Sequence, residues 1–554
     1  MAVINGDNND NTLDGTPDDD TINGLGGNDT INGEGGHNTL NGGDGNDLLI
    51  STGSIDTIDG GTGQDFWIGD YSASTANLRF SEVKAGVFNL TGGVSLTSVE
   101  GFNLRLGSGD DTVVLKHSLT DNGDDLIPYH SAGMDGGAGN DTLTMTLSPN
   151  PGLPFPVTLT YNADGSGVIR TDNSHTLPFS SFETINLTAQ NGDDTFTVTG
   201  GPSAHFHING YLGTDSAQVD LSYATAPITF ALNNATDAVS TFVGDGSSLE
   251  NVEWVRLTTG SGDDTLTGGT GADFITSGDG NDVVEGGLGD DHLDGGKGVD
   301  TVSYAHAASA VTVDLSPGSA SGGEGSDGLL NFENITGSAF DDTLTGSHFA
   351  NLIDGGAGAD VMAGAEGNDT YIVGDPGDVV IENASEGVAD TVDASITYAL
   401  GANVENLVLT GSGDIDGTGN DLKNVITGNG GANVLAGGLG DDTLTGGLGD
   451  DTFLFDTAPA KNTNEDTITD FSVTDDTIAL DHAVFAALSP GALPASAFHS
   501  GLGTVATAAG QHIIYDTTNG AIAYDSDGKG GAASVVFAHV TPGLALTVAD
   551  FFVV

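Results

Sequence analysis

The sequence predicts an all-β fold made of very short strands that recur every nine residues. In the first 70 residues, large apolar side chains stand nine apart, at Leu13, Ile22, Ile31, Leu40, Leu49, Ile58 and Trp67. An aspartate or asparagine precedes each of them by two residues, and paired or nearly paired glycines come before most of these. A disordered Gly/Asp tract would not keep apolar residue, carboxylate and glycine in one register, so the period argues against disorder.

Each nine-residue unit divides into a turn and a strand. The glycines permit positive φ angles and close backbone approach, and the apolar residue with its small or β-branched neighbours suits a strand. If successive strands lie on opposite faces of a flattened coil, one coil takes two units. Asp29, Asp47 and Asp65 would then stack on one edge, and Asp20, Asn38 and Asp56 on the other.

The charge of the chain requires cations in this fold. The 79 Asp and Glu residues against 10 Lys and Arg give a formal net charge of -69, and stacked carboxylates repel one another unless something bridges them. Aspartate side chains and the carbonyls of glycine turns offer only oxygen, which calcium prefers, whereas magnesium demands tighter octahedral geometry. The sequence therefore predicts several bound Ca²⁺ ions, and it argues against nucleic acid and anionic membranes as partners.

The repeats resemble the RTX (repeats-in-toxin) nonapeptide G-G-x-G-x-D-x-U-x, where U is a large apolar residue. The segments "GGDGNDLLI" (42–50), "GGAGNDTLT" (136–144), "GGTGADFIT" (268–276), "GGLGDDHLD" (286–294), "GGAGADVMA" (355–363) and "GGLGDDTLT" (437–445) fit it closely. The resemblance implies a right-handed parallel β-roll or β-solenoid, with calcium held between consecutive turns by aspartate carboxylates and backbone carbonyls.

The metal ligands that the resemblance implies are the aspartates in the sixth position of the units. They are Asp20, Asp29, Asp47, Asp56, Asp65, Asp141, Asp264, Asp273, Asp282, Asp291, Asp300, Asp342, Asp360, Asp369, Asp442 and Asp451. Asparagine stands in this position at 38, 351, 424 and 433. Calcium sites that use those turns are expected to be weaker or empty.

Several RTX arrays alternate with wider β segments. The predicted arrays are 1–70, 258–302, 335–370 and 411–455, with β-rich, solenoid-like segments and short RTX-like turns over 71–257 and β insertions at 303–334 and 371–410. Most intervening segments end in a phrase such as "SVEGFNLRLGSGDDTVV" or "SFETINLTAQNGDDTFTV", which indicates a strand leading into a new coil. The sequence leaves open whether they stack continuously, with inserted hairpins as at "YNADGSGV", or fold as separate sandwiches.

Residues 456–554 resemble the C-terminal cap and secretion signal of RTX proteins exported by type I systems. Asp550 precedes a wholly apolar tail, whereas the N-terminus lacks the basic and apolar stretches of a signal peptide. "DHAVFAALS" (481–489) could form a short helix. Asp525 and Asp527 could ligate another ion or form an acidic turn.

The chain lacks the motifs of the commonest enzymes that carry such repeats. There is no H-E-x-x-H of a zinc protease and no G-x-S-x-G of a lipase, and the absence of cysteine excludes thiolate sites. His205 and His207 would point to one side of a strand, but without a third ligand they are better interpreted as surface histidines than as a zinc site. No apolar run is long enough to span a membrane, which argues against membrane insertion.

Other residues with possible chemistry also fit the repeat. The pairs Asp110/Asp111 and Asp193/Asp194 could imitate the two carboxylates of a glycosidase, but they occupy the aspartate position of the recurring phrase, which favours calcium or turn chemistry. Trp67 and Trp254 could stack on sugars, but both occupy apolar strand positions and are better interpreted as core.

The sequence thus favours a secreted, non-enzymatic calcium-binding structural protein, folded by calcium outside the cell. Its expected partners are the type I secretion machinery and further copies of itself, in a surface layer, filament or matrix. One alternative is an adhesin or polysaccharide-binding protein that uses the segments between the arrays. The other is a solenoid polysaccharide-modifying enzyme with its site in the wider coils.

Overall fold

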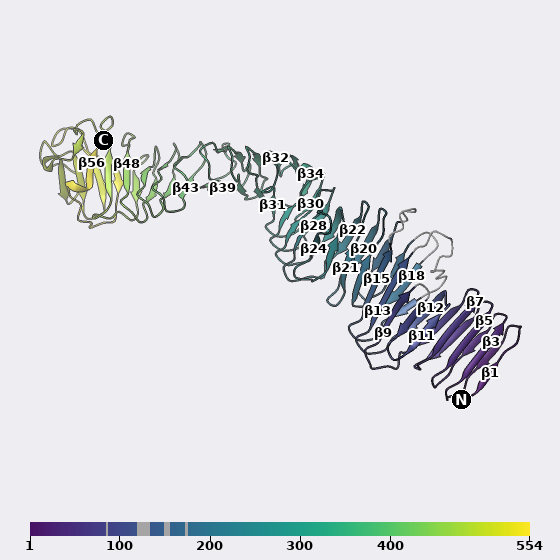
Figure 1. Cartoon of the computed structure of the whole chain (residues 1–554). Coiled ribbons are helices and arrows are strands. Elements are labelled where there is room, and N and C mark those ends of the chain that lie inside the picture. The colour runs from purple at the N-terminus through teal and green to yellow at the C-terminus, as the bar shows by residue number, and fades with distance from the viewer. Residues whose placement is uncertain (85–86, 119–132, 149–155, 172–175) are drawn as a thin grey trace. The chain divides into compact units, whose positions relative to one another are not determined.

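The computed structural model describes residues 1–554 except 85–86, 119–132, 149–155 and 172–175 (Figure 1). Strands joined by turns make up most of the described chain, and its helical elements are two 3₁₀ turns, η1 (Ala495–Ala497) and η2 (Val548–Asp550). The all-β prediction is therefore confirmed. Within the described residues, no helix has the length and apolarity needed to cross a membrane. The chain divides into two compact units, Met1–Asp300 and Thr301–Val554.

The first unit contains two long sheets and three further strands that pair with one another. In spatial order, the first long sheet contains β1 (Val3–Asn5), β3 (Thr21–Gly26), β5 (Thr39–Asp44), β7 (Thr57–Thr62), β11 (Val94–Thr97), β10 (Val87–Leu90), β9 (Arg79–Lys84), β13 (Thr112–Ser118), β15 (Thr142–Ser148), β19 (Thr184–Thr188), β21 (His205–Asn209), β25 (Ser248–Glu250) and β24 (Val239–Thr241). The second contains β2 (Thr12–Asp14), β4 (Thr30–Asn32), β6 (Leu48–Thr52), β8 (Phe66–Asp70), β12 (Gly101–Arg105), β14 (Gly133–Asp135), β18 (Thr176–Ser180), β17 (Gly167–Arg170), β16 (Thr158–Tyr161), β20 (Thr195–Thr199), β22 (Ser216–Asp220), β26 (Trp254–Thr258), β28 (Phe274–Thr276) and β30 (His292–Asp294). The three further strands, which pair in parallel, are β23 (Thr229–Ala231), β27 (Thr265–Thr267) and β29 (Val283–Glu285).

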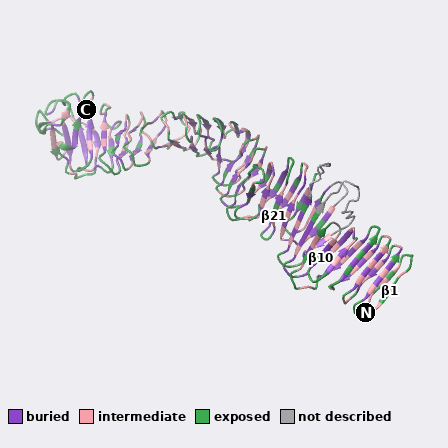
Figure 2. Ribbon diagram, viewed as in Figure 1, coloured by how far each residue is buried: buried purple, intermediate pink, exposed green. Residues whose placement is uncertain are grey.

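The register of these strands shows that one coil takes two nonapeptides. Ile22 of β3 pairs in parallel with Leu40 of β5, and Leu40 pairs with Ile58 of β7. The other nonapeptide of each coil lies in the second sheet, where Ile31 pairs with Leu49. These apolar side chains are fully buried and form the interior stripe between exposed turns (Figure 2). The predicted coil of two units is confirmed, and each buried aliphatic side chain stabilises it by about 1.5–3 kcal/mol.

The segments between the arrays of the first unit continue the stack instead of forming separate sandwiches. After the first array, β9, β10 and β11 form an antiparallel meander, in which β11 pairs in parallel with β7 and β9 with β13. The expected hairpin at "YNADGSGV" is present, since β16 and β17 pair in antiparallel fashion around it. Two extra strands thus widen a coil without ending the solenoid.

Aromatic side chains fill the wider coils. Trp67 is fully buried, donates from Nε1 to Ser51 Oγ at 2.9 Å, and stacks on Phe80 with ring centroids 5.9 Å apart. Phe80 in turn stacks on Phe88 at 5.4 Å. The core interpretation of Trp67 is therefore confirmed, whereas Trp254 at the start of β26 is half-buried.

The second unit repeats this architecture and ends in a closing set of strands. Its first sheet contains β31 (Thr301–Ser303), β35 (Asn334–Thr336), β37 (Leu352–Asp354), β39 (Thr370–Val373), β41 (Thr391–Ala394), β43 (Asn406–Leu409), β45 (Val425–Thr427), β47 (Thr443–Thr445), β49 (Asp466–Ile468), β55 (Val535–His539), β54 (Ala521–Tyr524), β53 (Ile513–Asp516) and β52 (Phe498–Gly501). Facing strands are β34 (Gly325–Leu330), β33 (Ser319–Gly322), β32 (Val311–Asp314), β36 (Thr343–Thr345), β38 (Val361–Ala363) and β40 (Val379–Val380). They are followed by β42 (Tyr398–Ala399), β44 (Gly417–Thr418), β46 (Val434–Ala436), β48 (Thr452–Phe455), β50 (Thr477–Leu480), β56 (Phe551–Val553) and β51 (Gly491–Ala492).

The C-terminal region differs from expectation at one segment. Residues 481–489 form successive turns, so the helix considered for "DHAVFAALS" is wrong. The ring of Phe485 packs against the rings of Tyr524 and Phe537, and this tertiary contact replaces helical periodicity. The apolar tail after Asp550 is strand β56, which pairs with β50, and Thr547 and Asp550 form a capping box at η2.

The close stacking of turns predicts different effects for two adjacent glycines. A Cβ atom on Gly431 would lie 2.3 Å from the Gly413 carbonyl oxygen of the preceding coil, whereas one on Gly430 would meet no atom within 4 Å. We expect Gly431→Ala to lower the free energy of unfolding by about 1–3 kcal/mol, because backbone cannot yield as a side chain would. Thermal unfolding in calcium should show Gly430→Ala near the parent protein, and equal effects of the two changes would contradict the stacking.

Candidate metal centres

Aspartates of the repeats form ladders along the edges of the coils. The backbone N–H of Asp29 donates to Oδ1 of Asp47 at 2.7 Å, and the N–H of Asp47 donates to Oδ1 of Asp65 at 2.8 Å. On the other edge, the N–H of Asp20 donates to Oδ1 of Asn38 at 2.9 Å. The predicted stacking of every second unit on one edge is therefore confirmed.

The structure buries all the aspartates that were predicted as metal ligands. At most 2 % of the surface of each is exposed, for Asp20, Asp29, Asp47, Asp56, Asp65, Asp141, Asp264, Asp273, Asp282, Asp291, Asp300, Asp342, Asp360, Asp369, Asp442 and Asp451. Buried carboxylates normally need a cation or several hydrogen bonds, because desolvation disfavours the charged form. Two groups can be distinguished among these aspartates by whether the second carboxylate oxygen accepts a hydrogen bond.

In the first group, the second carboxylate oxygen is buried without a hydrogen-bond partner. This holds for Oδ2 of Asp29, Asp47, Asp65, Asp141 and Asp360. Burial raises the pKa of Asp65 and of Asp141 to about 7; repulsion from nearby carboxylates adds to the shift and a backbone hydrogen bond opposes it. These orphaned oxygens are the donors that a hard cation would use.

The orphaned oxygens of Asp29 and Asp47 each lie beside a carbonyl oxygen of the next coil, at the first glycine of the nonapeptide. The position that a Cβ atom would take on Gly24 lies 2.2 Å from Asp29 Oδ2 and 2.4 Å from the Gly42 carbonyl oxygen. On Gly42, the corresponding distances are 2.3 Å to Asp47 Oδ2 and 2.2 Å to the Gly60 carbonyl oxygen. Calcium prefers carboxylate and carbonyl oxygens as ligands, and both kinds of oxygen meet at these turns, so the residues present fit this ion. Bound calcium would neutralise the carboxylates and link consecutive coils.

In the second group, a nearby donor occupies the second oxygen. Thr16 donates from its N–H and its hydroxyl to Asp20 Oδ2 at 2.7 Å, and Ser54 Oγ donates to Asp56 Oδ2 at 2.7 Å. Gly269 N–H donates to Asp273 Oδ2 at 2.7 Å. These turns have a weaker electrostatic need for a cation than the turns around Asp29 and Asp47.

Asparagine satisfies the same turn without a cation. Asn38 Nδ2 donates to the carbonyl oxygens of Gly33 and Gly35 at 2.9 and 3.0 Å. Asn424 Nδ2 also donates to a backbone carbonyl, that of Val404, 20 residues earlier, at 3.0 Å. The carboxamide thus places its positive end beside backbone oxygens, which gives a physical reason for the predicted weakness of calcium sites at asparagine turns.

The ladders also include residues that the nine-residue pattern did not assign. Aspartates that accept a ladder N–H beyond the predicted set are Asp111, Asp194, Asp215, Asp378, Asp390, Asp466 and Asp476. Glutamates take the same place after an inserted segment, at Glu100, Glu183, Glu253 and Glu405. The recurring phrases carried this signal for the four glutamates and for Asp111 and Asp194, which they contain, but not for the other five aspartates.

Two other candidate ligand groups have local explanations. Phe206 and Ile208 are buried in β21, so the flanking His205 and His207 point to the other side of the strand as predicted, and His207 Nδ1 lies 2.8 Å from Ser248 Oγ. Asp527 accepts hydrogen bonds from the N–H groups of Gly531 and Ala532, which supports the acidic-turn interpretation of that segment.

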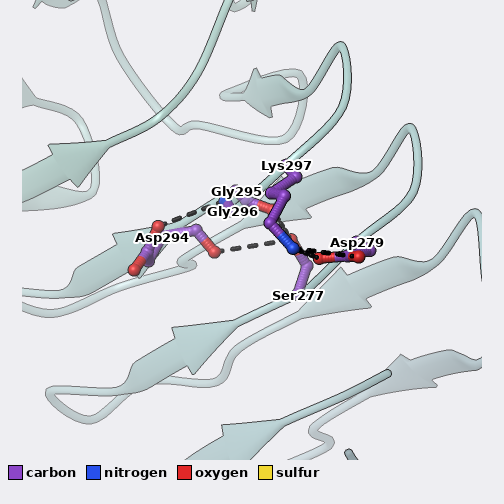
Figure 3. A network of polar contacts seen from close by, with 6 residues as sticks. All are labelled: Ser277, Asp279, Asp294, Gly295, Gly296 and Lys297. Atoms are coloured by element: carbon purple, nitrogen blue, oxygen red, sulfur yellow. Dashed lines mark hydrogen bonds and ion pairs between the residues drawn. The ribbon is translucent and has the colours of Figure 1, made fainter. Parts of the chain in front are cut away.

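A lysine provides the cation at one exposed pair of turns. Lys297 Nζ lies 2.8 Å from Asp279 Oδ1 and bridges two coils, while Ser277 Oγ donates to the Gly295 carbonyl oxygen at 2.8 Å (Figure 3). The Lys297 and Asp279 side chains are 81 % and 56 % exposed, so their ion pair adds little stability.

Comparison with protein families agrees with this geometry. A family model described as the RTX calcium-binding nonapeptide repeat matches residues 5–40, 41–70, 134–144, 258–293, 268–302, 336–371 and 418–453. The chain is an RTX-repeat protein. No curated protein matches it. In this RTX-repeat protein, the family matches fall on coils whose aspartates form the buried ladders, which supports calcium as the ion.

Proposed function

We propose that this RTX-repeat protein is an extracellular calcium-binding structural protein that folds when calcium binds and then self-assembles. The observation that carries the proposal is the repeated cradle, a buried carboxylate oxygen without a partner that faces a carbonyl oxygen of the next coil. Without cations, a chain with a net charge of -69 that buries such oxygens would repel itself. Calcium binding therefore contributes directly to the free energy of folding.

The same dependence suits export before folding. In a cytosol poor in calcium the chain stays open, and outside the cell calcium at about 10⁻⁴–10⁻³ M, the affinity range of extracellular modules, closes the coils. The type I secretion machinery is the proposed partner for this export. The support is the likeness of the C-terminal region to type I signals, since "LTVADFFVV" ends in the apolar strand β56.

A second row of carboxylates supports self-assembly. Asp110, Asp263 and Asp341 stand beside the buried ladder aspartates but are exposed, and each accepts an N–H from the next turn. Calcium bound to these exposed oxygens could bridge neighbouring copies in a surface layer, filament or matrix. In contrast, Phe80, Phe88, Phe230 and Phe242 of the segments between the arrays stack in the interior, where they cannot contact a sugar.

Calcium titration of the chelator-stripped, full-length chain tests the proposal. Far-UV circular dichroism and light scattering are followed together at constant ionic strength, with magnesium as the matched control. We expect a coil-to-β transition with calcium, followed by growth in scattering. Folding without growth would overturn self-assembly and favour the soluble adhesin or the polysaccharide-modifying enzyme, and no transition would overturn the calcium dependence.

A further inference from the structure

Three buried carboxylates lie close together in the second unit, whereas an ordinary turn of the repeat provides one. Carboxylate oxygens of Asp369, Glu382 and Asp390 all lie within 4.8 Å of one another. The three residues are 1 %, 6 % and 0 % exposed. Asp369 belongs to the nonapeptide array, but Glu382 and Asp390 belong to the longer turn "ENASEGVAD" that follows it. The turn thus brings side chains to the ladder that the repeat does not provide.

Glu382 stands where the preceding coils have the glycine that forms the cradle. Gly346, Gly364 and Glu382 follow one another at the spacing of one coil. In the first of these cradles, a Cβ atom on Gly346 would lie 2.2 Å from Asn351 Oδ1 and 2.6 Å from the Gly364 carbonyl oxygen. One coil after Gly364, the glycine is replaced by Glu382, whose carboxylate lies close to that of Asp369.

Each carboxylate has one oxygen held by the protein and one left free. Asn351 N–H donates to Asp369 Oδ1 at 2.7 Å, and Asp369 N–H donates to Asp390 Oδ1 at 2.9 Å. The buried Tyr371 hydroxyl donates to Glu382 Oε1 and accepts from Gly364 N–H. Asp369 Oδ2, Glu382 Oε2 and Asp390 Oδ2 are buried without a hydrogen-bond partner. The arrangement holds the carboxylates in place and leaves three oxygens for a ligand.

The surrounding sequence provides no cationic side chain of its own for this cluster. There is no lysine or arginine between Lys297 and Lys423. Three ionised groups so close together would therefore need a cation of high charge density.

We propose that Asp369, Glu382 and Asp390 form a dedicated site for one hard divalent cation, of the calcium type, that binds more tightly than the cradles of the repeats. Three carboxylates replace the single carboxylate and carbonyl oxygens of an ordinary turn, and affinity for calcium rises with the charge and rigidity of the ligand set. Tyr371 is a positioning residue, because its hydroxyl fixes Glu382 Oε1. The site fastens the long turn over 382–390 to the last coil of the array.

Competition against a chromophoric chelator, with the full-length chain in calcium, tests this site. We expect one ion per chain to be about tenfold or more tighter than the rest. Glu382→Gln should abolish the tight binding of this ion. Glu366→Gln, which changes an exposed carboxylate in the neighbouring turn, should leave that tight binding intact. Retention of the tight ion in Glu382→Gln would overturn the proposal and favour a cluster that shares protons.

A second variant and a second probe keep the result independent of folding defects. Glu382→Gly restores the residue of the preceding coils and should also lose the tight ion, while circular dichroism in calcium reports an intact fold. Terbium bound beside the Tyr371 ring should show sensitised emission that Tyr371→Phe and Glu382→Gln both reduce; unchanged emission in both would contradict the site. The count of tight ions needs neither export nor assembly, so the site can stand if the proposed function fails.

Discussion

The calcium-free chain is expected to regain β structure when the pH falls from about 8 to about 5.5, because protons replace calcium on the buried carboxylates. Burial raises the pKa of Asp65, Asp141, Asp194 and Asp215 to about 7, from an ordinary value of 3.8. A raised carboxyl pKa means that the folded state holds its proton more tightly than the unfolded state. Stability from these groups is therefore present at acid pH and is lost as the pH rises from 3.8 towards 7.

The effect should be large because several such groups act together, each contributing about 1.4 kcal/mol per unit of pKa difference. Circular dichroism of metal-stripped protein is the measurement, with light scattering to exclude precipitation near the isoelectric point of about 4.1. In saturating calcium the trend should reverse, since protons compete with the ion for the same oxygens. An identical calcium-free spectrum at both pH values would contradict the role of the buried carboxylates.

The period of nine residues was enough to predict the coil and its edges. Leu40 and Ile58 pair in the expected register, and Asp29, Asp47 and Asp65 stack as expected, because each depends only on local spacing. Whether the intervening segments stack could not be predicted, since the meander β9–β11 depends on β11 pairing with β7 and β9 pairing with β13. Such pairings depend on contacts between residues that are far apart in the sequence.

The ladder residues that the sequence analysis did not assign lie where the register breaks. Glu100 accepts the N–H of Asp65 from 35 residues away, after an inserted meander, so no fixed spacing reveals it. Glu382 takes a glycine position, and the repeat pattern gives it no role. At 481–489, apolar spacing was compatible with a helix, but so short a helix is marginal alone and packing of Phe485 decides the structure. The recurring phrase marks Glu100, but its partner Asp65 and the position of Glu382 beside Asp369 become visible only when the coil is closed.

Exchanging carboxylate for carboxamide at one turn is expected to have opposite effects with and without calcium. Asp47→Asn removes a buried oxygen that lacks a partner and supplies an amide that can donate to backbone carbonyls, as Asn38 does to Gly33 and Gly35. At low calcium this change should stabilise the fold by about 1–3 kcal/mol. At saturating calcium it should destabilise the fold, because the parent turn gains an ion that the variant cannot bind.

The reverse exchange, Asn38→Asp, provides the matched control on the opposite edge. It removes the two hydrogen bonds of Nδ2 and leaves a carboxylate oxygen in a buried turn, so it should destabilise the calcium-free fold and create a new dependence on calcium. Thermal midpoints of both variants, measured at low and at saturating calcium, should therefore move in opposite directions. A shift of the same sign under both conditions would mean that these carboxylates serve only as hydrogen-bond acceptors, and that calcium stabilises the solenoid through other oxygens.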